Sequence, residues 1–229
     1  MIAACRSNMV KLLLSILSEE EGVEEDTLRL KLGVNELDLS LLRELAEEGL
    51  LSRENGYWWM RDKFGLALKA LRLGASIEAV AQSFTWRDFE WFSSKAFEAN
   101  GYEVLRSVRF SYQGRRYEVD VVAAKKPLVV LVDCKSWGIV SGKASRLRSC
   151  TLKHVERVKA FKGSLSELKR KPNMEGWDKA YLVPVVVTIF EEAVKVHMGV
   201  PIVPIFKLNS FISELETYLD TVNAELITL

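Results

Sequence analysis

The sequence predicts an α/β fold in which a mixed sheet flanked by helices follows a small N-terminal helical domain. Apolar strands are expected at 116–124 and 127–135, and again at about 179–189 and 200–206. A basic helix near 150–170 separates these two pairs of strands. Strands interrupted by a helix in this way are typical of a sheet that is covered by helices.

The N-terminal segment has the pattern of a winged helix-turn-helix. Three short helices are expected: the first has apolar residues at helical spacing from Val10 to Leu17, the second covers Glu25–Leu32, and the third runs from an N-cap at Asn35 to Gly49. A hairpin with the turn Asn55-Gly56 follows. Three helices and a two-stranded wing resemble the winged-helix family, and we assign residues 1–64 to this domain.

The charge of this domain argues against contact with DNA. Through residue 60 the chain has 12 acidic and 6 basic residues, a net charge of −6. In a DNA-binding winged helix the third helix enters the major groove, and here it carries five acidic residues against one basic residue, Arg43. Because phosphates would repel such a surface, the pattern favours a protein-contact or dimerisation role over base readout.

The second predicted domain covers residues 85–229 and is joined to the first by connecting helices at 65–84. Its first helix has an N-cap at Thr85 and runs to about Ala99. A strand at about 102–112 then leads into the sheet, and a final helix is expected near 209–222.

Two carboxylates and a lysine emerge together from the predicted central strands. Asp120 lies on the strand at 116–124, and Asp133 and Lys135 end the apolar run that begins at Pro127. Carboxylate oxygens are suitable ligands for a hard divalent cation such as Mg²⁺. Such an ion polarises a phosphate and lowers the pKa of water, while a nearby lysine steers or deprotonates the water or stabilises the charged transition state. The pattern therefore indicates a site that cleaves phosphodiester bonds.

Strand geometry predicts which of these side chains share a face. If Lys125-Lys126 forms a tight antiparallel turn, Asp120 lies opposite Leu131 and Glu118 lies opposite Asp133. Since side chains alternate with a period of two, four polar residues would share one face: Glu118, Asp120, Asp133 and Lys135. The cysteine between the last two would point the other way, which leaves its backbone carbonyl as a further oxygen ligand.

At these residues the chain resembles the PD-(D/E)xK nuclease superfamily, which has the restriction-endonuclease-like fold. Within that superfamily it is most similar to the Mrr-type endonucleases and the archaeal Holliday junction resolvases. The resemblance covers roughly residues 85–206 and rests on Phe89 to Val104, Glu118–Val122 and Val130–Lys135. Val119 stands where the name of the superfamily has proline.

The resemblance implies a role for each polar residue. Asp120 and Asp133 would bind Mg²⁺ or Mn²⁺ with the backbone carbonyl of Cys134, and Glu90 would complete or support the metal site. Lys135 would position the attacking water. Related enzymes often carry a glutamine on the following helix, where this chain offers two candidates without an assigned role: Lys153 and His154. The alternative is an ordinary surface ion pair between Asp133 and Lys135, with Glu90 as a solvated helix residue.

A strongly basic stretch follows the candidate site. Residues 135–171 contain 11 basic and two acidic residues, a net charge of +9, which suits a polyanion. We predict that seven of the basic residues contact the DNA backbone: Lys143, Arg146, Arg148, Lys153, Arg157, Lys159 and Lys162. The alternative is a solvated helix face.

These observations predict a metal-dependent DNA endonuclease that acts in repair, recombination or restriction, as a homodimer that the N-terminal domain helps to form. Three cysteines without metal-ligand spacing and apolar runs too short to span a membrane predict a cytoplasmic protein. Two alternatives remain open: a non-catalytic DNA-binding module on a nuclease-like fold, and a transcription regulator led by the winged helix. The sequence leaves the nucleic-acid substrate open, RNA included.

Overall fold

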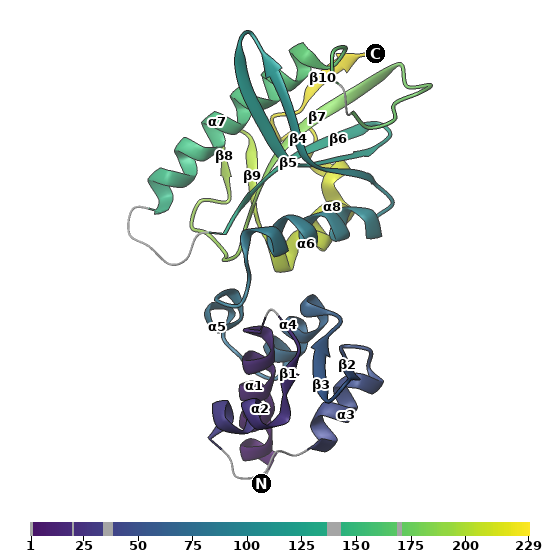
Figure 1. Cartoon of the computed structure of the whole chain (residues 1–229). Coiled ribbons are helices and arrows are strands. Elements are labelled where there is room, and N and C mark those ends of the chain that lie inside the picture. The colour runs from purple at the N-terminus through teal and green to yellow at the C-terminus, as the bar shows by residue number, and fades with distance from the viewer. Residues whose placement is uncertain (1, 20, 34–38, 137–142, 169–170) are drawn as a thin grey trace. The chain divides into compact units, whose positions relative to one another are not determined.

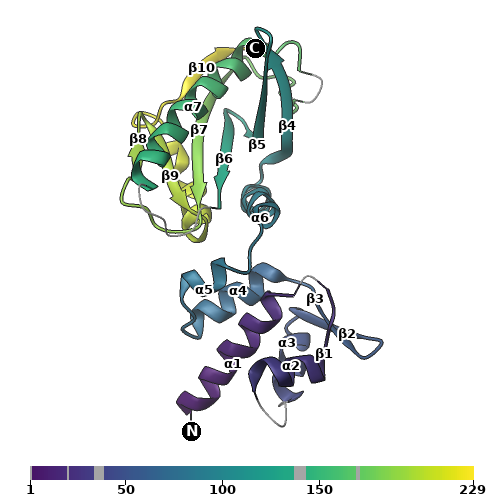
Figure 2. The same ribbon diagram turned by 60° about the vertical axis from the view of Figure 1, so that its left-hand side comes forward.

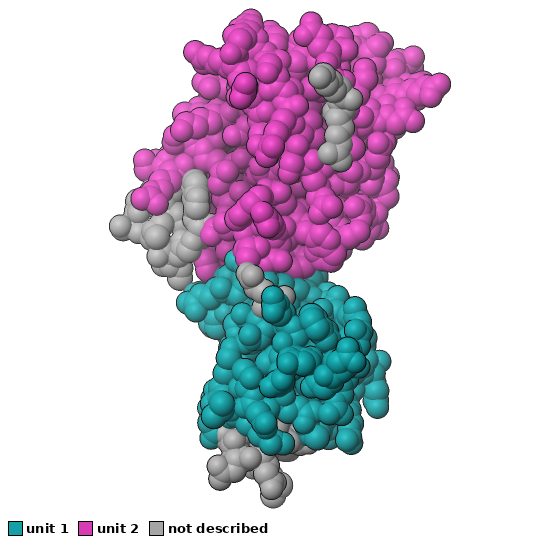
Figure 3. All heavy atoms as spheres, in the orientation of Figure 1, with its two compact units in different colours: residues 1–84 teal, residues 85–229 magenta. Residues whose placement is uncertain are grey.

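The computed structural model describes residues 2–19, 21–33, 39–136, 143–168 and 171–229, and these belong to two units, residues 1–84 and 85–229 (Figure 3). Each unit buries its own set of apolar side chains. Within the described part of the chain, no helix is long and apolar enough to cross a membrane.

Unit 1 contains helices around a small antiparallel sheet in which β3 pairs with both β1 and β2. Its described elements are α1 (Ile2–Leu17), β1 (Val23–Glu24), α2 (Glu25–Leu32), α3 (Leu39–Glu47), β2 (Leu51–Glu54), β3 (Tyr57–Met60), α4 (Lys63–Arg72) and α5 (Ile77–Ala81) (Figure 1). The turn between β2 and β3 has positive φ at Asn55 (51°) and Gly56 (85°), which confirms the predicted hairpin. The predicted N-cap Asn35 lies outside the described residues. This order of elements is the one expected of a winged helix, and membership of that class stays a prediction.

Unit 2 carries the larger sheet. Its elements are α6 (Trp86–Ala99), β4 (Glu103–Tyr112), β5 (Arg115–Lys125), β6 (Leu128–Lys135), α7 (Lys143–Ser164), β7 (Lys179–Thr188), β8 (Val196–His197), β9 (Val200–Pro204), α8 (Leu208–Glu214) and β10 (Glu225–Thr228) (Figure 1). A capping box between Thr85 and Asp88 begins α6 at the residue that the sequence predicts.

The sheet of unit 2 has the strand order β4-β5-β6-β7-β9-β8, with β10 also paired to β7. β6 and β7 are parallel because α7 carries the chain back between them. The predicted mixed sheet with flanking helices is therefore confirmed. Helix α7 packs Val158 and Phe161 against Leu131 on one face. Helix α6 lies on the other face of the sheet (Figure 2). There Ser93 Oγ is 3.4 Å from Cys134 Sγ.

Two elements differ from the sequence prediction. Helix α7 begins at Lys143 and ends at Ser164 rather than covering 150–170, because its buried stripe already includes Leu147. The predicted last helix ends early: α8 passes at Leu215 into a 3-10 turn. The short strand β10 follows, and its burial alternates too briefly to give a clear sequence signal.

The predicted register of β5 and β6 is wrong by two residues, because the turn is Lys126-Pro127. Lys125 pairs with Leu128, and Pro127 stays out of the ladder because proline has no N–H to donate. The observed register places Asp120 beside Asp133. A shift of two residues leaves each side chain of β6 on its predicted face.

Next to the candidate site, the side chains of β4 and β5 stop alternating regularly between the two faces of the sheet. Tyr117 stacks on Phe110, whose ring packs edge-on against Phe161 of α7. Val122 also belongs to the core under α7. Five residues separate Tyr117 from Val122, so a regular period of two would place them on opposite faces. The alternation is broken between them, where Ser107 on β4 has a φ of 51°.

This change of face moves Glu118 away from the carboxylate of Asp133. Its neighbour Tyr117 faces α7, so Glu118 points to the opposite side of the strand. There it accepts a hydrogen bond of 3.0 Å from Nε of Arg109 on β4. The prediction that Glu118 shares one face with Asp133 and Lys135 is therefore wrong.

Candidate active site

The candidate site opens where β5 and β6 part. Their ladder ends at the pair Val121↔Val132, although β6 stays paired with β7 to its last residue. Beyond the last pair, Asp120 Oδ2 accepts a hydrogen bond of 2.7 Å from the backbone N–H of Cys134. A carboxylate thus takes the place of the next backbone acceptor in the ladder.

The donors at this gap are hard oxygen atoms. The N–H and the C=O of one strand residue point to the same edge, so the Cys134 carbonyl faces the gap with the carboxylates of Asp120 and Asp133. Mg²⁺ and Mn²⁺ prefer such ligands. The Cys134 thiol lies on the other face, beside Ser93. The donor chemistry therefore fits the predicted cation, although among the described residues no three His, Cys, Asp or Glu side chains are grouped to hold one.

Asp133 is the centre of a buried ion-pair network. Its side chain is 2% exposed. Arg157 Nη1 donates to Oδ1 at 2.7 Å, and Lys135 Nζ lies 2.8 Å from Oδ2. The Cys150 thiol also donates to Oδ2, with Sγ at 2.9 Å. Burial by itself would raise the pKa of Asp133, but the charges of Lys135 and Arg157 lower that pKa to about 2, so Asp133 is a carboxylate at neutral pH.

The negative charge of Asp133 also raises the pKa of the other two ionisable groups at the gap, Asp120 and Lys135. Burial and the negative charge of Asp133 raise the pKa of Asp120 above its ordinary value. A bound cation would offset both effects. Burial disfavours the charged form of Lys135, but the carboxylate of Asp133 outweighs burial and raises the pKa of the lysine. Lys135 is therefore an ammonium ion at neutral pH.

Glu90 is coupled to the site from α6. Burial, and then the negative charges of Asp120 and Glu118, raise its pKa to about 7, against a hydrogen bond with Ser107 that lowers it. Glu90 thus lies within electrostatic reach of Asp120. Its predicted part in metal binding stays a prediction.

The basic residues of α7 divide between two flanks of the helix. A cavity of about 360 Å³ beside Asp133 is lined by Asp133, Lys135, Arg146, Ser149, Cys150, Lys153 and Arg157. Three of the predicted DNA contacts therefore lie at the candidate site, because positions 146, 153 and 157 recur at helical spacing. Arg148, Lys159 and Lys162 do not line this cavity, and Lys162 binds Glu225 at 3.3 Å. The side chain of Lys143 is outside the described part of the chain.

Comparison with known proteins supports this assignment of the second unit. Residues 81–173 match the restriction endonuclease family that is defined by the Mrr catalytic domain. The match includes Glu90, Asp120, Asp133 and Lys135. An uncharacterized protein of Archaeoglobus fulgidus is 31% identical over 134 residues, which cover 58% of this chain and 94% of the relative. The chain belongs to the Mrr-type restriction endonuclease family.

Two solved structures are similar to this Mrr-type protein at low sequence identity. Protein VC1899 from Vibrio cholerae is 15% identical with a TM-score of 0.35, and the likeness covers 96% of this chain and 53% of that one. Can2 from Sulfobacillus thermosulfidooxidans, solved with cyclic tetra-adenylate, is 9% identical with a TM-score of 0.33, over 92% and 52% of the two chains. The chain thus spans about half the length of both.

Sequence reasoning missed two contacts of Asp133 and one contact of Arg157 in this Mrr-type site. Arg157 was predicted to contact DNA, and the structure places it against Asp133. Cys150 and His154 were given no role, yet Cys150 donates to Asp133 and His154 contacts Arg157. The spacing of 150, 154 and 157 does predict one side of a helix. It does not show that this side meets Asp133.

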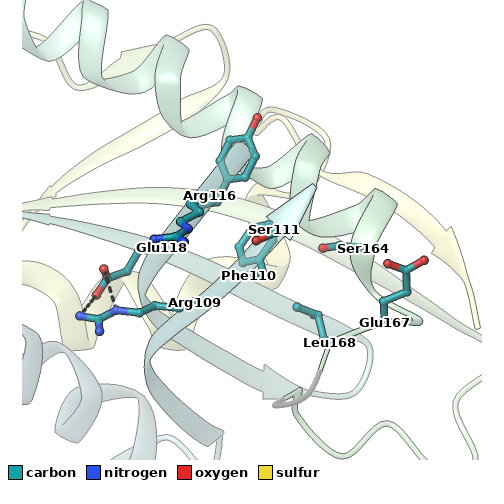
Figure 4. A pocket seen from close by; sticks show the side chains of 9 residues that line it. Arg109, Phe110, Ser111, Arg116, Glu118, Ser164, Glu167 and Leu168 are labelled. Atoms are coloured by element: carbon teal, nitrogen blue, oxygen red, sulfur yellow. Dashed lines mark hydrogen bonds and ion pairs between the residues drawn. The ribbon is translucent and has the colours of Figure 1, made fainter. Parts of the chain in front are cut away.

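A larger cavity of about 810 Å³ lies elsewhere in unit 2, between the β4–β5 hairpin and the residues at the end of α7 (Figure 4). Phe110 and Leu168 contribute apolar surface, and Glu118 and Arg109 pair with each other at its rim (Figure 4). None of the Mrr-type carboxylates at the β5–β6 gap lines this cavity. We therefore place the candidate site at the smaller, basic cavity.

Proposed function

We propose that this protein is a metal-dependent nuclease that hydrolyses phosphodiester bonds in DNA. The observation that carries the proposal is the gap between β5 and β6. There Asp120 and Asp133 lie side by side, and a charged Lys135 contacts Asp133 within a basic cavity. The family match of residues 81–173 supports the same reading.

The residues at the gap have distinct roles in this proposal. Asp120, Asp133 and the Cys134 carbonyl would hold Mg²⁺ or Mn²⁺, which when bound supplies positive charge that polarises the phosphate and stabilises the leaving oxygen. Because Lys135 is protonated, it orients the attacking water and stabilises negative charge rather than removing a proton. Arg146 and Lys153 bind the neighbouring phosphates without reading sequence.

A cleavage assay tests this function. Wild-type protein is incubated with labelled linear duplex, single-stranded DNA, a four-way junction and RNA, in Mg²⁺, in Mn²⁺ or in EDTA. We expect metal-dependent cutting that EDTA stops and that Asp120→Asn loses, while Asp120→Asn keeps its affinity for DNA. The preferred substrate then narrows the biological role among repair, recombination and restriction.

One observation favours a second candidate, a DNA-binding module without catalysis. Arg157 and Lys135 both contact the Asp133 carboxylate, so side chains of this chain compensate its charge. This candidate predicts equal DNA binding by wild type and Asp120→Asn with no cutting by either protein. Metal-dependent cutting excludes it.

The two flanks of α7 give a matched pair of DNA-binding variants. We expect Lys153→Ala, on the cavity flank, to weaken duplex binding and to lower the slope of log Kd against log salt concentration by about one. Lys159→Ala, on the other flank, should leave the slope unchanged, because its ammonium group lies away from the cavity. Binding is measured by fluorescence anisotropy in EDTA. A larger effect of Lys159→Ala would contradict this placement of the DNA.

We also propose that unit 1 serves protein contact rather than base readout. Its excess of acidic over basic residues supports this role, because like charge repels the DNA backbone. Cutting both strands of a duplex needs two active sites, and a homodimer that unit 1 helps to form would supply them. Sedimentation equilibrium of the full chain tests the dimer, and a mass of one chain at every concentration excludes it.

A further inference from the structure

We infer that His154 is a positioning residue of the candidate active site, which acts by holding Arg157 against Asp133. The inference rests on the proposed function, because it takes Asp133 to be a ligand of the metal. His154 is fully buried under the sheet, with 0% exposure. Its Nε2 lies 2.8 Å from the backbone oxygen of Leu131, and its Nδ1 lies 3.2 Å from Arg157 Nη1.

The partners of His154 define its protonation state. A backbone carbonyl only accepts hydrogen bonds and a guanidinium group only donates them. The ring satisfies both partners only when Nε2 carries the proton and Nδ1 is an acceptor. His154 is thus a neutral imidazole in one tautomer, and the low pKa of about 4 that burial gives it agrees with this state.

These contacts form a closed ring of interactions. Leu131 and Asp133 belong to the same strand, β6. The strand carbonyl of Leu131 holds His154, His154 holds Arg157, and Arg157 Nη1 donates to Asp133 Oδ1 at 2.7 Å. The guanidinium is therefore anchored to the backbone of the strand whose carboxylate it contacts. Such a ring fixes the direction of the Asp133 carboxylate.

The contact with His154 matters because other cations near Arg157 repel its guanidinium group. The cavity that it lines also contains the cationic side chains of Lys135, Arg146 and Lys153. Without an acceptor at His154, the guanidinium nitrogen that contacts Asp133 loses its second partner. Repulsion by the neighbouring cations then favours a turn toward solvent. The carboxylate of Asp133 would keep its charge and its contacts with Lys135 and Cys150 at Oδ2, but Oδ1 would lose the donor that holds it in place.

The full-length variants His154→Gln and His154→Leu separate positioning from packing. A glutamine amide offers one N–H to Leu131 and one oxygen to Arg157, whereas leucine fills the space without either bond. Mn²⁺ affinity is measured by electron paramagnetic resonance without DNA, and cleavage by steady-state kinetics. Outer contacts of metal ligands typically contribute about 10- to 100-fold in affinity or activity, and we expect a loss of this order in His154→Leu. We expect His154→Gln to restore most of both, with KM for DNA unchanged in both variants.

Three results would overturn the inference. The first is a folded His154→Leu protein that binds Mn²⁺ as tightly as wild type, and the second is an equal loss in the glutamine and leucine variants. If His154→Leu does not fold, His154→Asn takes its place, because its shorter amide does not reach both partners. Wild-type affinity in His154→Asn is the third such result.

The Mn²⁺ measurement also separates this inference from the proposed function. Wild-type protein that binds Mn²⁺ and cuts no substrate refutes the nuclease, while the comparison of His154 variants still decides the role of the histidine. Wild-type protein that binds no Mn²⁺ refutes both. Circular dichroism of each variant shows that the protein is folded.

Discussion

Replacing Asp133 by alanine is expected to lower the free energy of unfolding of unit 2 by about 3 kcal/mol and to abolish cutting. The side chain is 2% exposed and compensates two cations, Lys135 and Arg157. Its removal leaves both cations partly buried without a counter-charge. Breaking such a pair costs more than its formation contributes, because the remaining charges stay desolvated. Urea unfolding with hydrogen exchange of β6 and β7 measures the loss in unit 2 alone.

Two variants calibrate this result. Asp133→Asn keeps an acceptor for Arg157, so we expect it to lose cutting with a smaller loss of stability. Glu118→Ala removes a carboxylate from an exposed pair with Arg109, which is worth about 0.5 kcal/mol or less. An Asp133→Ala protein that is as stable as Glu118→Ala would show that the network around Asp133 contributes nothing.

Lys135→Met is expected to reduce kcat by about 10²- to 10³-fold and to leave DNA affinity nearly unchanged. The lysine contacts Asp133 and is charged at neutral pH, so in the proposed mechanism it would stabilise negative charge that develops during the reaction. Methionine keeps most of the packing of the aliphatic chain and removes the ammonium group. Single-turnover cleavage in Mg²⁺ measures the rate, and anisotropy in EDTA measures binding.

Lys135→Arg distinguishes a cation from a general base. An arginine stays protonated, so it keeps part of the rate if the lysine acts through its charge. A lysine that removes a proton from water would make the arginine variant as slow as the methionine variant. Equal rates in the two variants would therefore contradict the protonated state that the contact with Asp133 indicates.

Much of unit 2 follows from local sequence signals. The apolar runs of β5, β6 and β7 predict buried strands, and Thr85 predicts the start of α6. Asp133 is a candidate because it ends such a strand, and Asp120 because it lies on the strand before it. Each of these signals lies within a few residues of the feature that it predicts, so the sequence alone was sufficient.

The missed features depend on contacts between distant segments. Arg157 is 24 residues from Asp133, and no local pattern shows that α7 crosses β6 at that point. The face change of β5 depends on the backbone of Ser107 on the neighbouring strand. The register error came from treating Lys125-Lys126 as the turn, when the missing N–H of Pro127 decides it. Only the first two required tertiary structure.

Where β5 and β6 part, each of the two strands still has a pairing partner along its other edge. Strand β5 is paired with β4, and β6 is paired with β7. The ladder between β5 and β6 ends at Val121↔Val132, and the two strands diverge beyond it. Asp120 and Asp133 are the first residues beyond this last pair. We expect the side-chain volume at this last pair to affect the spacing of the two carboxylates, although neither valine is a proposed ligand. Changes in the bulk of Val121 or Val132 would then alter the affinity of the proposed site for an ion without replacing any of its ligands.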